Sequence, residues 1–318
     1  MTEDVQTLRP KRVSNRVYHL VGLVLMALNV VRHRIRGYRQ PRPFTASGAR
    51  EAMTYDNAVV ENWLRHLEHY LDEEVDLAGK RVLEIGPGPD LGTGLNLLAR
   101  GAAAYVAVDK HPLLGKHATS VHRALLGVIA EDLELDQERV TELRKIVDER
   151  TGDPDGPLAY HHLPEFDLSV LPEQSADLVL SHSAFEHLDD VETTFRQLAP
   201  VAAPGCVLVT EIDLQTHTRW IRDADPLNIY RYRNRTYQAL GFSGSPNRVR
   251  PDEYLSGLEA AGWTNPRFYP RRVLDRDYVH EVEPSLARRF QGDPEQLAWL
   301  SIVLCATRKR GRRWKANP

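Results

Sequence analysis

Short apolar runs alternate with helical patterns through residues 81–308, and this alternation limits the fold more than any other feature of the chain. Strands that alternate with helices form a mostly parallel sheet with helices on both faces. The sequence therefore predicts an α/β fold with a doubly wound, mostly parallel sheet and a ligand site at the carboxyl ends of the strands. The expected strands are Arg81–Gly86, Tyr105–Asp109, Ser175–Ser183, Gly205–Asp213 and Leu297–Arg308, and the expected helices are Leu95–Ala102, residues 191–202 and Glu253–Trp263.

A segment rich in Pro, Gly and Arg, Arg36–Arg50, separates the start of the chain from the rest. Such a composition marks a domain boundary. It divides the chain into a basic N-terminal extension, residues 1–50, and a main domain, residues 51–318. The main domain is expected to begin with a helix, because apolar residues recur there at helical spacing. They are Val59, Val60, Trp63, Leu64, Leu67 and Leu71.

Basic residues are concentrated at the two ends of the chain. Residues 1–50 hold ten Lys and Arg against two acids, and the tail 308–318 holds six against none. Residues 51–307 keep 25 basic and 42 acidic residues, a net charge of −17. Because an acidic body is a poor electrostatic footprint for nucleic acid, a nucleic-acid partner is not expected. The basic ends suit an anionic membrane surface, or are solvated termini.

The apolar stretch Val17–Val31 lies between Arg16 and Arg32 and is 15 residues long. A helix that spans a membrane needs about 20 residues, and the stretch lacks the cleavage site of a signal peptide. We predict a helix that lies on the protein's own core, on a second copy in a homodimer, or on a membrane interface. Cys206 and Cys305 each lie in an apolar run, which indicates buried thiols and a cytoplasmic location, peripheral to the membrane if this helix binds lipid.

The run VLEIGPGPDLG, Val82–Gly92, takes a predicted strand into a sharp turn. A dinucleotide-binding turn has a third glycine three residues after the second, and Leu91 occupies that position. Glu84 precedes the first glycine, which suits a ligand with a positive group better than a diphosphate. S-adenosylmethionine (SAM) carries a sulfonium and an ammonium and no phosphate. Asp109 ends the next strand, where a carboxylate can bind both ribose hydroxyls.

These segments resemble the class I, Rossmann-like SAM-dependent methyltransferases over about residues 80–308. VLEIGPG matches their first motif, VAVDK their acidic ribose position, and ADLVLSHSAFEHLDD their fourth strand and the loop after it. FDLSVLP, residues 166–172, has the spacing in which an Asp binds the adenine amino group and the next backbone N–H binds the ring. The family's third glycine falls near Asp90 and is displaced here to Gly92, which predicts a different local path.

The resemblance implies a seven-stranded sheet with helices on both faces, to which this chain adds helical insertions and an N-terminal helical extension. It also implies methyl transfer and SAM as the cofactor. The residues expected to bind the cofactor are Glu84, Gly86, Pro87, Gly88, Asp109, Lys110, Asp167, Leu168 and His182.

Methyl transfer to a hydroxyl benefits from a general base, and histidine suits this role because its pKa lies near working pH. His187 follows the fourth strand and His217 follows the fifth, so both are expected at the mouth of the cofactor cleft as catalytic residues. His182, Glu186 and His187 are also an allowed set of metal ligands. Because neighbouring side chains on one helix diverge, no metal site is expected.

Two insertions distinguish the chain. A helical insert at about 112–160, with its core at Val121–Arg150, is either a lid or a packed layer. A second insert at about 214–252 is rich in Tyr, Arg and Asn, including Tyr230, Tyr232 and Tyr237, and is expected to bind the acceptor by stacking and hydrogen bonds.

The sequence thus predicts a SAM-dependent methyltransferase that acts on a hydroxyl of a small-molecule or glycan acceptor. The alternatives are an N-methyltransferase, a nucleic-acid methyltransferase and a SAM-binding protein without turnover.

Overall fold

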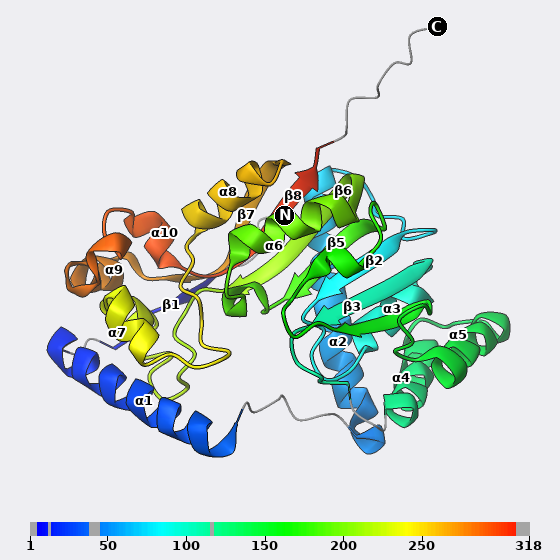
Figure 1. Cartoon of the computed structure of the whole chain (residues 1–318), viewed down its shortest axis with the longest axis horizontal. Coiled ribbons are helices and arrows are strands. Elements are labelled where there is room, and N and C mark those ends of the chain that lie inside the picture. The colour runs from blue at the N-terminus through cyan, green and yellow to red at the C-terminus, as the bar shows by residue number, and fades with distance from the viewer. Residues whose placement is uncertain (1–4, 12–13, 38–44, 115–117, 310–318) are drawn as a thin grey trace, which may run out of the picture.

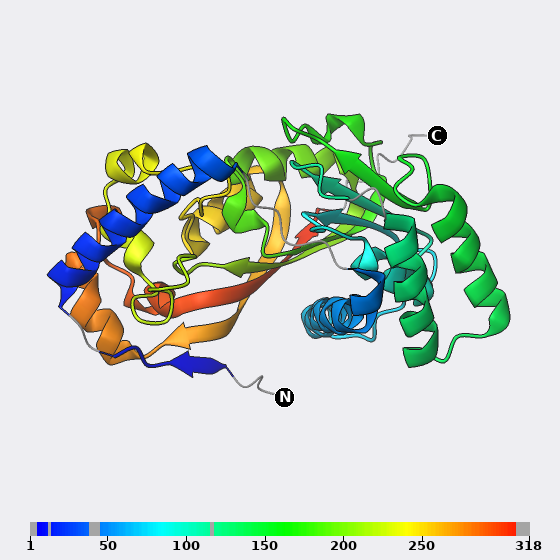
Figure 2. The ribbon, with the colours of Figure 1, turned by 90° about the horizontal axis from the view of Figure 1, so that it is seen from below.

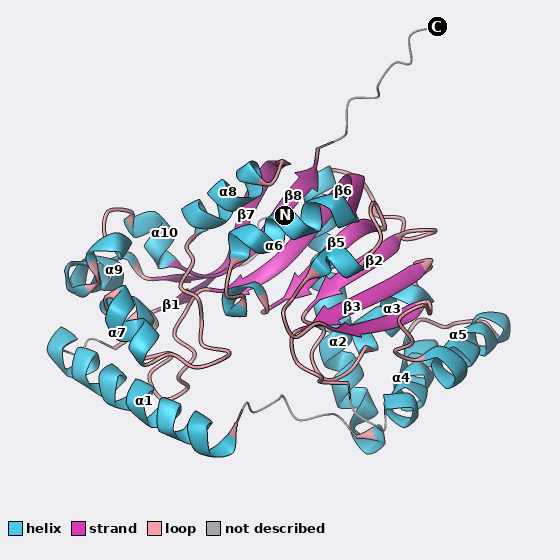
Figure 3. Cartoon of the chain, viewed as in Figure 1, coloured by secondary structure: helices cyan, strands magenta, loops and turns pink. Residues whose placement is uncertain are grey.

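The computed structural model of the chain describes residues 5–11, 14–37, 45–114 and 118–309. Its centre is an eight-stranded sheet in the order β1-β7-β8-β6-β5-β2-β3-β4 (Figure 1, Figure 3). Only β8 runs antiparallel to its neighbours among these strands. The strands are β1 Gln6–Leu8, β2 Arg81–Ile85, β3 Ala104–Asp109, β4 Leu158–His162, β5 Ala176–His182, β6 Ala202–Asp213, β7 Trp263–Leu274 and β8 Trp299–Arg308.

Helices cover both faces of the sheet, as the alternating pattern predicted, so the predicted fold class is confirmed. One face carries α2 to α5, and the other carries α6 and α8. The helices are α1 Asn15–Arg36, α2 Ala49–Leu71, α3 Gly92–Ala99, α4 Ala118–Asp132, α5 Gln137–Arg150, α6 Val191–Val201, α7 Asn234–Ala239, α8 Pro251–Ala260, α9 Arg276–Val282 and α10 Pro294–Ala298.

The predicted strand number was seven, and the structure has one more because β1 adds a parallel edge strand beside β7 (Figure 2). The sequence did not indicate β7 itself. This strand contains Pro266 and Pro270, which remove ladder donors, and its register shifts around both. Proline is tolerated in a sheet at such irregular, weakly paired positions. Burial of β7 is only partial along most of its length, which hides the usual apolar signal.

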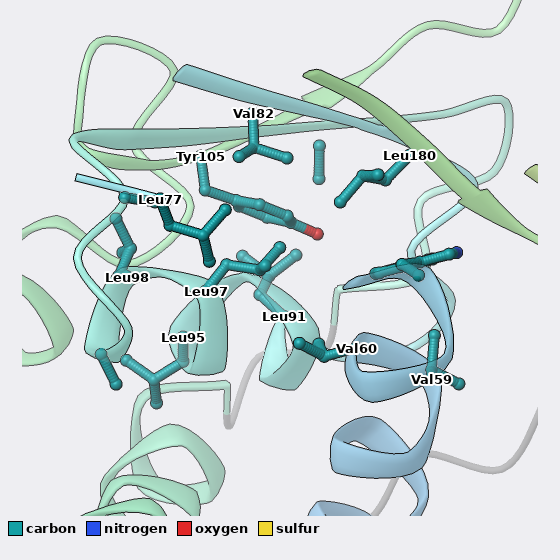
Figure 4. Close-up of a cluster of buried hydrophobic side chains, with 14 of the residues drawn as sticks. Val59, Val60, Leu77, Val82, Leu91, Leu95, Leu97, Leu98, Tyr105 and Leu180 are labelled. Atoms are coloured by element: carbon teal, nitrogen blue, oxygen red, sulfur yellow. The ribbon is translucent and has the colours of Figure 1, made fainter. Parts of the chain in front are cut away.

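The helical insert is a packed layer. Its helices α4 and α5 bury Leu125, Ile129, Leu143 and Val147 in the same core as α2 and α3. Figure 4 shows part of this core, with Tyr105 of β3 pointing in among leucines from α3 and β5. The insert therefore thickens one face of the sheet and does not form a lid.

The N-terminal helix α1 is longer than the apolar stretch that predicted it and lies along the outside of the molecule (Figure 1, Figure 2). It rests on the second insert through backbone contacts. The Asn228 amide donates to Tyr18 O at 3.0 Å, and the Tyr232 hydroxyl donates to His19 O at 2.9 Å. A Cβ on Gly22 would lie 2.1 Å from Tyr232 Oη, so a side chain there would separate the two.

Both cysteines are free and buried, as predicted. Among the described helices, none is long and apolar enough to cross a membrane. Four parts of the predicted basic ends lie outside the described residues. They are residues 1–4, 12–13 and 38–44 of the extension and residues 310–318 of the tail.

Candidate active site

A pocket of about 590 Å³ opens at the carboxyl ends of β2, β3 and β5. Its floor is the turn after β2, and helix α2 closes one side with Tyr55, Asp56 and Val59. This is the place where open α/β sheets bind their ligands. The predicted residues in its wall are Glu84, Gly86, Pro87, Gly88, Asp109, Lys110, His182 and His187.

The glycine turn has the geometry that the sequence suggested. Gly86 has a φ of 72° and Gly88 a φ of 81°, a region that side chains with a Cβ adopt rarely. A Cβ on Gly86 would also lie 2.5 Å from the Cβ of Ala184 in the loop after β5. Position 86 therefore requires glycine for two reasons, backbone conformation and space.

The displaced glycine, Gly92, makes room for an acid. A Cβ there would lie 1.9 Å from Asp56 Oδ2 of α2. At the position of the usual third glycine, Leu91 is fully buried and its N–H donates to Nε2 of the buried His122 at 3.1 Å. Burial lowers the pKa of His122 to about 4, which keeps this nitrogen able to accept. Asp56 of α2 and His122 of α4, both outside the motif, thus hold the loop in place, and a path different from the family's stays a prediction.

Three carboxyl groups lie close together at the base of the pocket, those of Glu84, Asp56 and Asp90. Glu84 accepts from the Thr93 hydroxyl at 2.7 Å and from the Tyr105 hydroxyl at 2.6 Å. Burial raises the pKa of Glu84 to about 7. Burial, followed by the charges of Asp90 and Glu84, raises the pKa of Asp56 to about 9. This acidic base fits a ligand with a cationic end, because a positive charge offsets the cost of ionising buried carboxylates.

Asp109 lies at the end of β3, where the ribose was predicted to bind. Its Oδ1 accepts from the His111 N–H at 2.8 Å, which orients the carboxylate, and burial raises its pKa to about 6. Lys110 also lines the pocket, and its ammonium is hydrogen-bonded to Asp189 on the opposite rim. Both residues stay predictions for cofactor binding, and their positions are compatible with it.

The predicted adenine residues lie differently. Asp167 is outside the described pocket wall, and its carboxylate accepts from the Ser169 N–H at 3.0 Å. Leu168 is fully buried in the core, and its N–H faces Gln197 Oε1 at 3.4 Å. Glu165 and Phe166, just before them, line the pocket instead. The assignment of adenine to Asp167 and Leu168 thus stays a prediction that this conformation does not support.

The two predicted catalytic histidines lie together. The ring centroids of His187 and His217 are 4.9 Å apart with the planes at 82°. His187 lines the pocket, whereas His217 is outside its described wall. Burial, followed by the charge of His217, lowers the pKa of His187 to about 4, so this ring is neutral at working pH. His182 lies 3.6 Å from Glu211 through its Nδ1, and burial lowers its pKa.

Glu186, beside these histidines, is as enclosed as Glu84. Its side chain is 3% exposed, and burial raises its pKa well above the usual range. Its Oε1 lies 4.0 Å from His217 Nε2. Glu186, His187 and His217 present ligand atoms that all lie within 4.8 Å of one another. The expected divergence of Glu186 and His187 does not occur, because they lie in a 3-10 turn, Phe185–His187.

The tyrosine-rich insert does not line the pocket as expected. Tyr230, Tyr232 and Tyr237 are largely enclosed and bond to backbone carbonyls of Leu214, His19 and Pro246. The stacking role expected for these three tyrosines is therefore wrong, because internal packing uses them. Ser243 and Gly244 are the residues of this insert that reach the described pocket wall.

Some pocket residues were not identified from the sequence. Asp56 lies in the buried stripe of α2, and an acid within an apolar stripe is the signal that marks it. Ser183 and Ala184 follow β5, and Ser183 has a φ of 53°. Non-glycine residues in this region cluster at functional sites. No local sequence pattern predicted that Ser183 and Ala184 line the pocket, because the turn after a strand has no fixed residue signature.

Comparisons with known proteins agree with this geometry. Residues 83–210 match the family model described as a methyltransferase domain. A search of the curated proteins found no match. The match to the family model spans the glycine turn, Asp109 and the loop with His187. This region is therefore a class I, SAM-dependent methyltransferase domain, as the motifs predicted, and SAM is its cofactor.

A search of the solved structures found chains that are similar at low identity and low TM-score. The carbon methyltransferase of CurJ is 14% identical, with a TM-score of 0.45 over 93% of this chain and 68% of its own. A SAM-dependent methyltransferase from Mesorhizobium loti is 16% identical, with a TM-score of 0.40 over 76% of this chain and 96% of its own. The [4+2]-cyclase SpnF is 14% identical, with a TM-score of 0.39 over 96% of this chain and 100% of its own.

Replacing Asp109 with alanine is expected to weaken SAM binding by roughly 1.5–3 kcal/mol, the scale of hydrogen bonds to a charged group. Titration calorimetry measures this as a loss of about tenfold to a hundredfold in affinity. The control is Asp153→Ala, which removes an exposed acid outside the described pocket wall. Equal affinities for the wild type and Asp109→Ala would remove Asp109 from the ribose site.

Replacing Asp56 with asparagine is expected to stabilise the ligand-free protein at about pH 8 and to change little at about pH 4. The folded state holds a proton on Asp56 that the unfolded chain releases above its ordinary pKa of 3.8. Wild-type stability therefore falls as the pH rises from there toward the folded pKa of about 9. Asparagine does not ionise in either state, so the variant does not lose stability over this pH range.

Thermal unfolding at the two pH values measures the effect, with Glu68→Gln on the exposed face of α2 as the control. A gain that is the same at both pH values, or a loss at the higher one, would contradict the protonated state of Asp56. In the same variant SAM should bind more weakly, because asparagine, unlike Asp56, cannot ionise when the cationic ligand binds beside it.

Proposed function

We propose that this chain transfers the methyl group of SAM to a hydroxyl group of a small-molecule or glycan acceptor. The observation that carries the proposal is that one pocket contains both the cofactor-binding turn and His187. A methyl donor at the turn and an acceptor at the histidine would share one enclosed space. Methyl transfer requires this, because the nucleophile must approach the methyl carbon in line with the sulfur and without competing water.

A neutral histidine favours oxygen as the acceptor atom. A hydroxyl becomes a strong nucleophile only when its proton is withdrawn, whereas an amine needs only to be neutral. Burial keeps His187 in the form that accepts a proton or a hydrogen bond. His217 lies against it on the side of β6 and supports the same end of the pocket.

The charge of the pocket favours a small or glycan acceptor over nucleic acid. Residues 51–307 carry a net charge of −17, and the pocket wall contributes Asp56, Glu84, Asp189 and Asp190. A phosphate backbone would be repelled by this surface. Neutral hydroxyl groups would not be repelled by it.

The free, buried cysteines support a cytoplasmic location for the reaction.

The test is methyl transfer from SAM with an isotopically labelled methyl group to fractions of a cell extract. We expect a labelled product whose methyl carbon has the chemical shift of an O-methyl group. A label on nitrogen or carbon would contradict the choice of acceptor atom, and a label in RNA or DNA would contradict the substrate class. Tight SAM binding without transfer to any fraction would make the chain a binding protein instead.

A further inference from the structure

The proposed function does not explain why the carboxyl group of Glu186 is buried. Within the described residues, the backbone N–H groups of Glu186 and Asp213 lie near its enclosed carboxyl group and act to lower its pKa, but neither carboxyl oxygen makes a hydrogen bond of ordinary geometry. Burying an unpartnered polar group costs roughly 1–3 kcal/mol, and a charged one costs more. Native proteins keep such groups where a bound ion, a water molecule or a catalytic role explains them.

The neighbours of Glu186 are arranged as metal ligands. His217 Nδ1 lies 2.9 Å from the carbonyl oxygen of Gln215, which can only accept, so this nitrogen carries the proton. His217 Nε2 is therefore a lone-pair donor, and it lies 4.0 Å from Glu186 Oε1. Two lone-pair groups that face each other repel unless a proton or a cation lies between them, and 4.0 Å is too long for a hydrogen bond through a shared proton. A histidine bonded through its other nitrogen to a backbone carbonyl is the usual state of a metal-ligating histidine.

His187 completes the set. In the described structure its Nδ1 is buried and has no partner, and its ring meets that of His217 at 4.9 Å. We propose that Glu186, His187 and His217 bind a divalent transition-metal ion. Two imidazoles and one carboxylate leave coordination positions open, and they suit zinc, iron or cobalt better than magnesium.

The place of the cluster suggests the role of the ion. His187 lines the cofactor pocket, so an open coordination position on its side would be available to an acceptor oxygen. A bound metal ion lowers the pKa of such an oxygen group. This role depends on the proposed methyl transfer to a hydroxyl, whereas the binding of the ion does not.

The experiment titrates zinc into full-length protein that has been treated with a chelator, and follows binding by calorimetry. Cobalt provides a second readout, since a site with nitrogen and oxygen ligands gives it visible absorption. We expect one ion per chain in the wild type, with affinity at least about tenfold lower in Glu186→Gln and His217→Gln, a conservative bound set by the effect of losing an outer-shell partner. The control is His182→Gln, a histidine of the same pocket outside the cluster, which should bind zinc as the wild type does.

Glutamine preserves the shape of Glu186, and circular dichroism checks that the variant is folded. Wild-type protein that binds no zinc, or equal binding in the wild type and Glu186→Gln, would overturn the proposal. Methyl transfer is measured separately with chelated and zinc-loaded protein. Zinc binding without methyl transfer would contradict the proposed function but not the metal site. Full methyl transfer by protein that binds no zinc would contradict the metal site but not the proposed function.

A different observation concerns α1, whose apolar residues point outward. Six of them, here called the apolar stripe, are between 50% and 76% exposed and recur every three or four residues. Such a face on a surface helix marks a contact with another molecule or a membrane. The stripe consists of Val17, Leu20, Val24, Leu28, Val31 and Ile35.

The helix cannot turn this stripe inward, because its other face is already bound. Gly22 and Met26 are buried, and the bonds from Asn228 and Tyr232 hold the first turns against the second insert. The stripe therefore belongs to the folded surface and does not arise from a loosely placed segment.

Charge identifies the partner of the stripe. Helix α1 contains no Asp or Glu, and Arg16, Arg32 and Arg34 are exposed around the stripe. We also infer that the stripe binds an anionic lipid surface. An apolar face flanked by arginines is the pattern of interfacial helices. Two copies of α1 that paired through the stripe would instead bring like charges together, because both ends of the helix are positive.

The stripe lies close to the pocket. The ring of His33, near the end of α1, stacks on Phe242 with centroids 4.9 Å apart, and the next two residues line the pocket. Docking of α1 would hold the pocket rim at the lipid surface. On the proposed function, the acceptor hydroxyl would then belong to a membrane-anchored molecule, such as a lipid-linked glycan.

Co-sedimentation of full-length protein with phosphatidylglycerol-containing and pure phosphatidylcholine vesicles tests this inference. We expect preferential binding to the anionic vesicles and its loss in a Leu20→Gln, Leu28→Gln, Ile35→Gln triple variant. Val170→Gln is the matched control, since Val170 is 57% exposed in another part of the fold. Each of Arg16→Gln, Arg32→Gln and Arg34→Gln should lower binding about fivefold, the equivalent of about 1 kcal/mol.

No binding to either vesicle, or equal binding by the triple variant and the wild type, would overturn the inference. A dimer that the triple variant dissociates, without vesicle binding, would assign the stripe to a second copy of the chain. Loss of vesicle binding with methyl transfer to soluble acceptors intact separates docking from the proposed function.

Discussion

Replacing Gly86 with valine is expected to abolish SAM binding, at least a hundredfold loss in affinity, because two penalties add. The backbone at this position has a φ of 72°, which a β-branched residue adopts only with strain. The new side chain would also meet Ala184, whose Cβ lies 2.5 Å from the Cβ position of residue 86. The turn would move away from the place where the cofactor must approach its backbone.

Calorimetry measures the loss, and circular dichroism and thermal unfolding establish whether the variant is folded. Gly79→Val is a matched control, since Gly79 also has a positive φ but has open space around it and lies outside the described pocket wall. It should lose some stability and keep SAM affinity. A folded Gly86→Val protein with normal SAM affinity would place the cofactor elsewhere.

Replacing His187 with alanine is expected to lower turnover by ~10²–10⁴, the usual contribution of a positioned proton acceptor. SAM affinity should change little, because the residues expected to hold the cofactor are the acidic base and Asp109. His217→Ala should also lower turnover, but less, since His217 contacts His187 and Glu186 and is outside the described pocket wall. His122→Gln tests a buried histidine that holds the cofactor loop, and it should weaken SAM binding instead of the chemical step.

Single-turnover rates with saturating SAM measure the chemical step apart from binding. Near wild-type rates in both single variants and in the double variant would exclude these histidines from the reaction. If only His217→Ala were slow, His217 would be the reacting group and the pocket would have to open toward β6.

Residues close together in the sequence were the easiest to place. Gly86, Gly88 and Asp109 lie at strand ends, and the strand and turn that carry them are local features, so their position in the pocket followed from the pattern of apolar runs. The parallel sheet and the covering helices followed from the same pattern, whereas the order of the strands came only from the structure. Strands β1, β4 and β7 were not predicted, because their prolines, charges or short length hide the apolar signal.

Residues brought together from distant segments were harder. Asp56 comes from α2 and meets Gly92 across the start of α3, and the sequence showed only an acid in an apolar stripe. Glu186 and His217 follow different strands, β5 and β6, and face each other only because those strands are neighbours. The three tyrosines of the second insert were expected to form an acceptor site, but Tyr230 and Tyr232 are buried in packing and Tyr237 is partly buried against Arg248.

The sequence by itself determined the fold class, the cofactor turn and the basic, apolar character of α1. These depend on short-range periodicity, on the backbone conformations that particular residues permit, and on charge. All three can be read from residues that are close together in the sequence. Only the tertiary structure decided that the apolar stripe points outward, that α4 and α5 are packed, and that Glu186 lies sealed beside two histidines. Those outcomes depend on which distant surfaces exclude water from each other, and no local pattern encodes that choice.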